Sequence, residues 1–135
     1  MIRILIVDDH PLVRRGVASV LGGAIPGAVV EQAGDGAGAL QAVHDAVFDL
    51  VILGLALPGR GGIDVLKELR SARPGLPVLI LSAYREDQLA VRALPAGAAG
   101  YVVKGSLAED FVSAVRTVLA GGKAIGASLR GATRL

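Results

Sequence analysis

The chain has 135 residues, 53% of them hydrophobic and 19% charged, with a formal net charge of +2 at pH 7. This length and composition fit one globular domain with a single core. The absence of cysteine excludes disulfides and thiolate metal sites, and every apolar run is far shorter than the roughly 20 residues of a membrane span.

Five short aliphatic or β-branched runs predict strands, at residues 3–7, 29–33, 50–53, 78–81 and 100–103. Apolar residues at helical spacing follow each run and predict helices with apolar faces within residues 13–21, 39–47, 65–69, 89–94 and 112–119. Strands that alternate with helices imply right-handed crossovers. We therefore expect an α/β fold, a doubly wound five-stranded parallel sheet with five helices.

Glycine and proline mark the expected helix ends. Pro11 fits the first turn of the first helix, with His10 or Asp9 as its cap, and glycine pairs end the first and fifth helices. The glycine-rich residues 34–38 lack the dinucleotide fingerprint and are interpreted as the start of the second helix. Pro95 lies late in the fourth helix, which should therefore be short or kinked.

Residues 124–135 are expected to form a linker or C-terminal tail after a domain spanning residues 1–123. No acidic residue follows Asp110, whereas four basic ones do: Arg116, Lys123, Arg130 and Arg134. Four scattered charges are a weak footprint for nucleic acid, so we interpret the tail as solvated. The N-terminal sequence lacks the layout of a signal peptide, and we expect a soluble cytoplasmic protein without membrane contacts.

Polar residues follow three of the predicted strands. Asp8 and Asp9 follow the first strand, Ser82 follows the fourth and precedes Ala83, and Lys104 follows the fifth. The carboxyl ends of parallel strands share one edge, which is where open α/β sheets bind ligands. Carboxylates suit Mg²⁺, and a hydroxyl and an ammonium suit phosphate oxygens. This edge is therefore a candidate site for a divalent cation beside a phosphoryl group.

Several motifs resemble the receiver domains of bacterial two-component response regulators, which have a flavodoxin-like (CheY-like) fold. The motifs are residues 4–16, 48–53, 57–59, 62, 81–83, 97–104 and 120–122. Within that family the sequence looks like the subfamily that carries a C-terminal LuxR-type helix-turn-helix. The resemblance covers about residues 2–123.

The resemblance implies roles for individual residues. The Mg²⁺ ligands would be Asp8, Asp9 and the backbone carbonyl of Ala56. The phosphoryl pocket would be formed by Ser82, Ala83 and Lys104, and the switch by Ser82 and Tyr101. Plain alternatives stay open: Asp8 and Asp9 as helix caps, and Tyr101 as a packing residue.

The phospho-acceptor position departs from the family. It holds Gly54, where the family has aspartate at the end of the third strand. Glycine offers no carboxylate nucleophile for acyl phosphate formation, and it removes a metal ligand. We expect a folded, non-enzymatic receiver that cannot be phosphorylated at position 54 and binds Mg²⁺ weakly. The sequence favours a recent or deliberate replacement over a long-standing loss, without deciding between them.

The resemblance also implies partners: an upstream sensor histidine kinase, a homodimer, and DNA through an effector domain that is not in this chain. The expected function is regulation of transcription in a phosphorelay, and we prefer a truncated chain to one that stands alone. One alternative is a phosphorylation-independent pseudo-receiver that acts as a protein–protein adaptor. Another is a flavodoxin-like or cobalamin-binding enzyme domain, against which Val13 stands, where the cobalamin motif has glycine.

Overall fold

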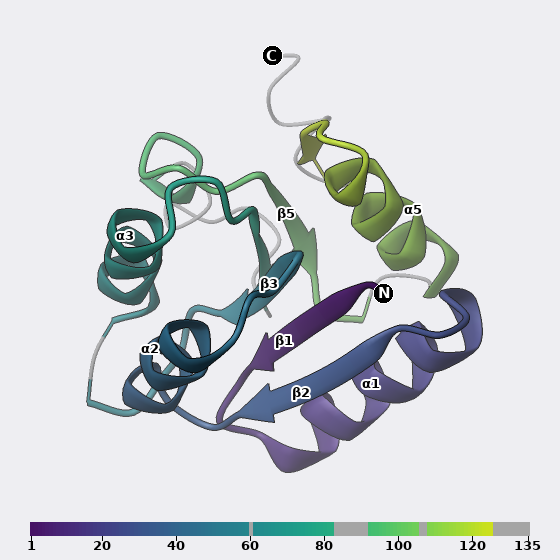
Figure 1. Ribbon diagram of the computed structural model, residues 1–135, viewed down its shortest axis with the longest axis horizontal. Coiled ribbons are helices and arrows are strands. Elements are labelled where there is room, and N and C mark those ends of the chain that lie inside the picture. Colours follow the sequence, from purple (N-terminus) through teal and green to yellow (C-terminus); the bar gives the residue numbers. More distant parts are fainter. Residues whose placement is uncertain (60, 83–91, 106–107, 126–135) are drawn as a thin grey trace.

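A computed structural model describes residues 1–59, 61–82, 92–105 and 108–125 (Figure 1). Its centre is a parallel sheet of six strands in the order β2-β1-β3-β4-β5-β6. The strands are β1 (Arg3–Val7), β2 (Val29–Ala33), β3 (Leu50–Gly54), β4 (Val78–Ser82), β5 (Gly100–Val103) and β6 (Ala124–Ile125). The first five strands have the order of a flavodoxin-like doubly wound sheet, which confirms the expected fold.

Helices cover both faces of the sheet (Figure 1). The four helices within the described residues are α1 (Pro11–Ala24), α2 (Gly36–Asp45), α3 (Gly62–Ala72) and α5 (Ala108–Leu119). Alternate residues of each strand enter opposite cores. In β1, Leu5 packs with the α2 and α3 side, whereas Ile4 and Ile6 pack with the α1 and α5 side. Both faces of the sheet are thus buried, as the near-continuous aliphatic runs predict.

The expected fourth helix lies largely outside the described residues. Arg92 and Ala93 are helical, and a Schellman motif follows, in which Gly97 N–H donates to Leu94 and Ala98 N–H to Ala93. Gly97 supplies the positive φ of 109° that this motif requires. Pro95 therefore sits in the last turn of the helical segment.

The expected sheet was one strand short. Residues 124 and 125, assigned to the linker, form β6 and pair with Gly100 and Tyr101 of β5. The backbone approaches closely here, because a β-carbon on Gly100 would overlap the Ala124 carbonyl oxygen. The absent side chain of Gly100 is what lets β6 extend the sheet edge.

The helix ends agree with the sequence in part. Asp35 caps α2 by accepting a hydrogen bond from Gly38 N–H at 2.7 Å, so the glycine-rich segment does start that helix. Gly121 closes α5 with a φ of 91°. The expected side-chain cap of α1 is wrong, since His10 occupies the N-cap position without a capping hydrogen bond. Its own backbone N–H instead donates to Asp8 Oδ1.

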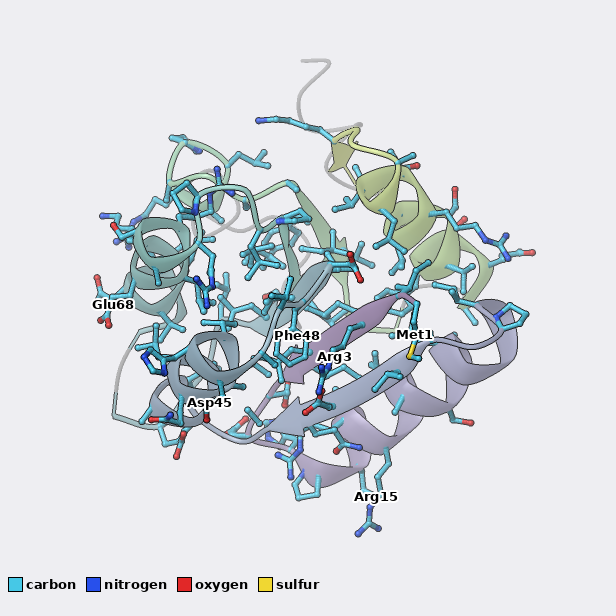
Figure 2. The ribbon with its side chains drawn as sticks, viewed as in Figure 1. Met1, Arg3, Arg15, Asp45, Phe48 and Glu68 are labelled. Atoms are coloured by element: carbon cyan, nitrogen blue, oxygen red, sulfur yellow. The ribbon has the colours of Figure 1, made fainter. Side chains whose placement is uncertain are left out.

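Arg3 of β1 contacts residues on both sides of its strand. Its Nε lies 2.6 Å from Glu31 Oε2, and its guanidinium lies 5.5 Å from the centre of the Phe48 ring. Its backbone N–H donates a hydrogen bond to Asp49 Oδ2. Figure 2 shows Arg3 beside Phe48.

In the part of the chain that is described, no helix has the length and apolar character to span a membrane.

Candidate functional site

The carboxyl ends of four neighbouring strands bring the candidate residues to one edge. Asp8 follows β1, Gly54 ends β3, Ser82 ends β4 and Lys104 follows β5. The register of the sheet aligns these ends, with Val7 opposite Leu53, Gly54 opposite Leu81, and Ser82 opposite Val103. The structure thus places the predicted residues along one line across the sheet.

Asp8 is the most enclosed charged group of this edge, with 2% of its surface exposed. Its Oδ2 lies 2.7 Å from Lys104 Nζ, and its Oδ1 accepts a hydrogen bond of 2.8 Å from His10 N–H. The His10 ring nitrogen Nδ1 lies 3.2 Å from Asp8 Oδ1 and 2.9 Å from Asp9 Oδ1. Both oxygens of Asp8 therefore already contact internal donors.

Competing effects set the pKa of the Asp8 carboxyl. Burial acts to raise the pKa, but the hydrogen bonds from Lys104 and from His10 N–H, together with the Lys104 charge, lower it on balance below the ordinary 3.8. Asp8 is therefore ionised at neutral pH, as an ion pair with Lys104 requires.

Gly54 leaves room that the Asp8 side chain takes. A β-carbon on Gly54 would lie 2.6 Å from Asp8 Oδ2 and 3.3 Å from both Asp8 Cγ and the Val7 carbonyl oxygen. Real β-carbons do not approach other atoms to 2.6 Å. The observed position of the Asp8 carboxylate therefore exists only because residue 54 has no side chain.

The remaining predicted residues differ in their placement. Ser82 is buried at the end of β4, and its carbonyl oxygen accepts a hydrogen bond from Lys104 N–H. Tyr101 is fully buried in the core on the α2 and α3 side. Ala56 is exposed in the loop after β3, and Ala83 lies outside the described residues.

Arg14 joins the site although its role was not predicted. Its Nη1 donates to the Asp8 carbonyl oxygen at 2.6 Å, and its Nε donates to Gln32 at 3.3 Å. A sequence signal existed, since position 14 lies one helical turn after His10 and its side chain points back toward the helix start. Arg14 fixes the backbone of the segment that carries both carboxylates.

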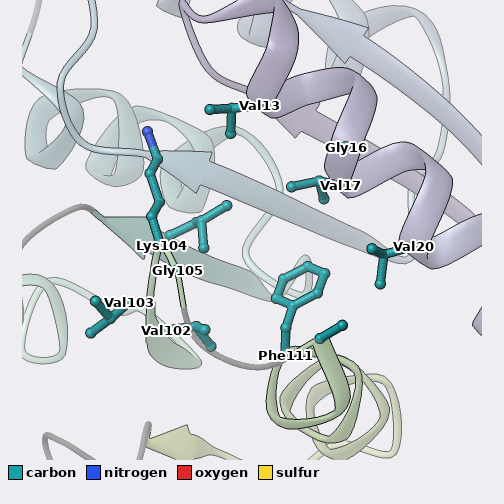
Figure 3. A pocket seen from close by; sticks show the side chains of 11 residues that line it. Val13, Gly16, Val17, Val20, Val102, Val103, Lys104, Gly105 and Phe111 are labelled. Carbon is teal, nitrogen blue, oxygen red and sulfur yellow. The ribbon is translucent and has the colours of Figure 1, made fainter.

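An apolar groove of about 270 Å³ lies beside the site, between α1 and the β5–α5 region. Figure 3 shows Val13, Val17 and Val20 of α1 opposite Phe111 of α5. Lys104 also lines this groove while its ammonium group pairs with Asp8. The lysine thus joins the groove to the carboxylates.

The polar groups of this edge could hold a divalent cation only by giving up contacts that they make within the chain. Oxygen atoms of Asp8 and Asp9 lie with a His10 nitrogen within 4.8 Å of one another, a spacing that could surround an ion. Magnesium takes oxygen ligands, among them one or two carboxylates. Both oxygens of Asp8 are engaged, Asp9 Oδ1 contacts His10, and position 54 adds no carboxylate.

Comparison with known proteins identifies relatives of this chain. Residues 4–116 match the family model described as the response regulator receiver domain. The transcriptional activator protein ExaE of Pseudomonas putida is 43% identical over 118 residues, covering 87% of this chain and 55% of that protein. The DNA-binding transcriptional activator DevR/DosR of Mycobacterium tuberculosis is 40% identical over 121 residues, covering 90% of this chain and 56% of that protein.

The chain therefore spans about half the length of the curated relatives it matches. Among solved structures, a LuxR-family two-component response regulator from Aurantimonas superposes with a TM-score of 0.90 at 34% identity. That match covers 96% of this chain and 92% of the other.

Proposed function

Because the chain belongs to the response regulator receiver family, we propose that it is the receiver module of a transcriptional regulator and that Gly54 prevents its phosphorylation. The observation that carries this proposal is the glycine at the end of β3, between Asp8 and Lys104. Transfer of a phosphoryl group to a receiver needs a carboxylate nucleophile at that place.

The neighbouring carboxylate is a poor substitute for the missing nucleophile. Asp8 is buried, and both of its oxygens contact donors, so an attacking oxygen would first have to leave Lys104 or His10. Ser82 and Lys104 are the groups that would hold phosphoryl oxygens if an acceptor were present. Asp8, Asp9 and the Ala56 carbonyl would be the Mg²⁺ ligands, with weak affinity because Gly54 adds none.

The relatives support a role in transcription. Two of them are named transcriptional activators, and the chain covers only about half of each. We propose that DNA contact belongs to an effector domain in the part of those proteins that this chain does not span. A sensor histidine kinase as partner, a homodimer and a cytoplasmic location belong to the same proposal.

Intact-mass spectrometry tests the proposal. The chain and its Gly54→Asp variant are incubated with acetyl phosphate and Mg²⁺, with Gly54→Asn as a control of similar size that lacks a carboxylate. Only Gly54→Asp should gain one phosphoryl mass. A gain in the unaltered chain would show that another residue accepts the group. No gain in a folded Gly54→Asp variant would favour the phosphorylation-independent adaptor.

A further inference from the structure

We propose that the Lys104 ammonium is the built-in cation of this pocket, paired with Asp8 in space that a side chain at position 54 would fill. In this arrangement Lys104 and a divalent cation compete for the same carboxylate. The inference rests on the proposed function, because it takes Asp8 as a metal-binding carboxylate. It concerns cation binding alone and needs no phosphoryl donor.

The ion pair depends on the order of the strands. Asp8 follows β1 and Lys104 follows β5, with β3 and β4 between them. Three strand spacings separate β1 from β5, roughly 14 Å in all at the usual 4.7–4.9 Å each. Neither side chain can cover that distance alone, so each must extend over a neighbouring strand toward the other.

Gly54 opens the path on the β3 side. Asp8 Oδ2 lies where it would be 2.6 Å from a residue 54 β-carbon, so the carboxylate has crossed onto β3. Lys104 extends over β4 and meets it at 2.7 Å. The pair therefore connects the end of β1 to the end of β5 over the two strands between them.

Burial makes this pairing effective. The Asp8 side chain is 3% exposed and that of Lys104 is 22% exposed, so both groups are largely removed from water. A cation that binds Asp8 Oδ2 has to displace an ammonium that the chain itself holds in place. Displacement would leave Lys104 beside the new positive charge, which adds repulsion at short range.

The size of residue 54, apart from its charge, should then control cation binding. Alanine at this position adds no ligand, yet its β-carbon must push Asp8 Oδ2 away from Lys104. The nearest backbone atom, the Val7 carbonyl oxygen at 3.3 Å, needs to give by only a few tenths of an ångström. Alanine should therefore break the pair and free Asp8 without disturbing the strand.

Calorimetric titration with MgCl₂ at neutral pH, without any phosphoryl donor, tests this inference. The samples are the unaltered chain, Gly54→Ala, Lys104→Met, and Gly16→Ala as a glycine-to-alanine control in an open position on α1. Circular dichroism and the unfolding midpoint in EDTA check that each variant is folded. Gly54→Ala and Lys104→Met remove the pair by independent routes, so one folded variant suffices for the test.

Each pair-breaking variant should bind Mg²⁺ about tenfold more tightly than the unaltered chain. Gly16→Ala should keep the affinity of the unaltered chain. The inference is overturned if the unaltered chain binds Mg²⁺ as tightly as the folded variants. Such a failure would leave the mass-spectrometric result for Gly54→Asp unaffected, so the two proposals can fail separately.

Discussion

Replacing Gly100 with alanine should detach β6 from the sheet. The new β-carbon would overlap the Ala124 carbonyl oxygen and lie 2.9 Å from its carbonyl carbon and 3.0 Å from Leu79 Cδ1. The overlapping oxygen belongs to the backbone, so no change of rotamer can relieve the contact. Leu79 is fully buried in the core. The strand β6 therefore has to move.

The cost follows from the contacts that β6 makes. Detachment breaks the 2.9 Å hydrogen bond from Ala124 N–H to the Ala99 carbonyl, worth about 1 kcal/mol net. It also exposes the Ala124 side chain, now 6% exposed, at a further cost of about 0.8 kcal/mol. Alanine also stabilises the folded state by about 0.4–1 kcal/mol, because it restricts the unfolded chain more than glycine does. The net loss of unfolding free energy should be about 1 kcal/mol.

Urea unfolding measures this loss, and hydrogen exchange locates it. The Ala124 amide should exchange faster in Gly100→Ala, whereas the amides of β1, which three strands separate from β6, should exchange at their original rates. An unchanged urea midpoint together with unchanged protection of Ala124 would refute the reasoning, because it would mean that β6 does not pack against Gly100.

Further predictions concern other parts of the fold. Gly16→Ala should raise the unfolding free energy by about 0.5–1 kcal/mol, because Gly16 lies within α1 and its β-carbon would meet open space; a lower thermal midpoint would contradict this. Asp35→Ala should cost about 1 kcal/mol in urea by removing the hydrogen bond to Gly38 N–H, and an unchanged midpoint would count against that cap. The pKa of Asp8 is lowered in the folded chain, so its stabilising contribution is complete above the unfolded value near 3.8 and is lost as pH falls through the folded value. In Asp8→Asn the urea midpoint should therefore fall less as the pH is lowered than it does in the unaltered chain. If the midpoints of both proteins fall equally over this pH range, the lowered pKa of Asp8 is contradicted.

The sequence predicted the main elements well, for a physical reason. Strands buried on both faces must be aliphatic throughout, so β3 and β4 stand out from their surroundings. Their observed bounds exceed the predicted ones by one residue each, at Gly54 and Ser82. Neither residue is aliphatic, so the hydrophobic pattern stops before the hydrogen-bonded ladder does.

The features that the sequence did not predict depend on contacts between distant segments. A two-residue strand such as β6 has no periodicity, and its pairing follows from the close approach at Gly100. The Asp8–Lys104 contact depends on where two side chains turn after their strands end, which spacing along the chain does not encode. Ser82 and Tyr101 are both buried. The sequence does not distinguish a residue that packs in the core from one that changes conformation in a switch.

The surroundings of Gly54 also bear on how the site can change by mutation. Some glycine codons become aspartate codons through a single base change. The tightest contact of a new β-carbon would be with the Asp8 side chain, whereas the nearest backbone oxygen lies 3.3 Å away. A carboxylate at position 54 therefore requires a side-chain rotation at Asp8 and little movement of the strand. In evolutionary terms, the backbone around position 54 could accept an aspartate with little change.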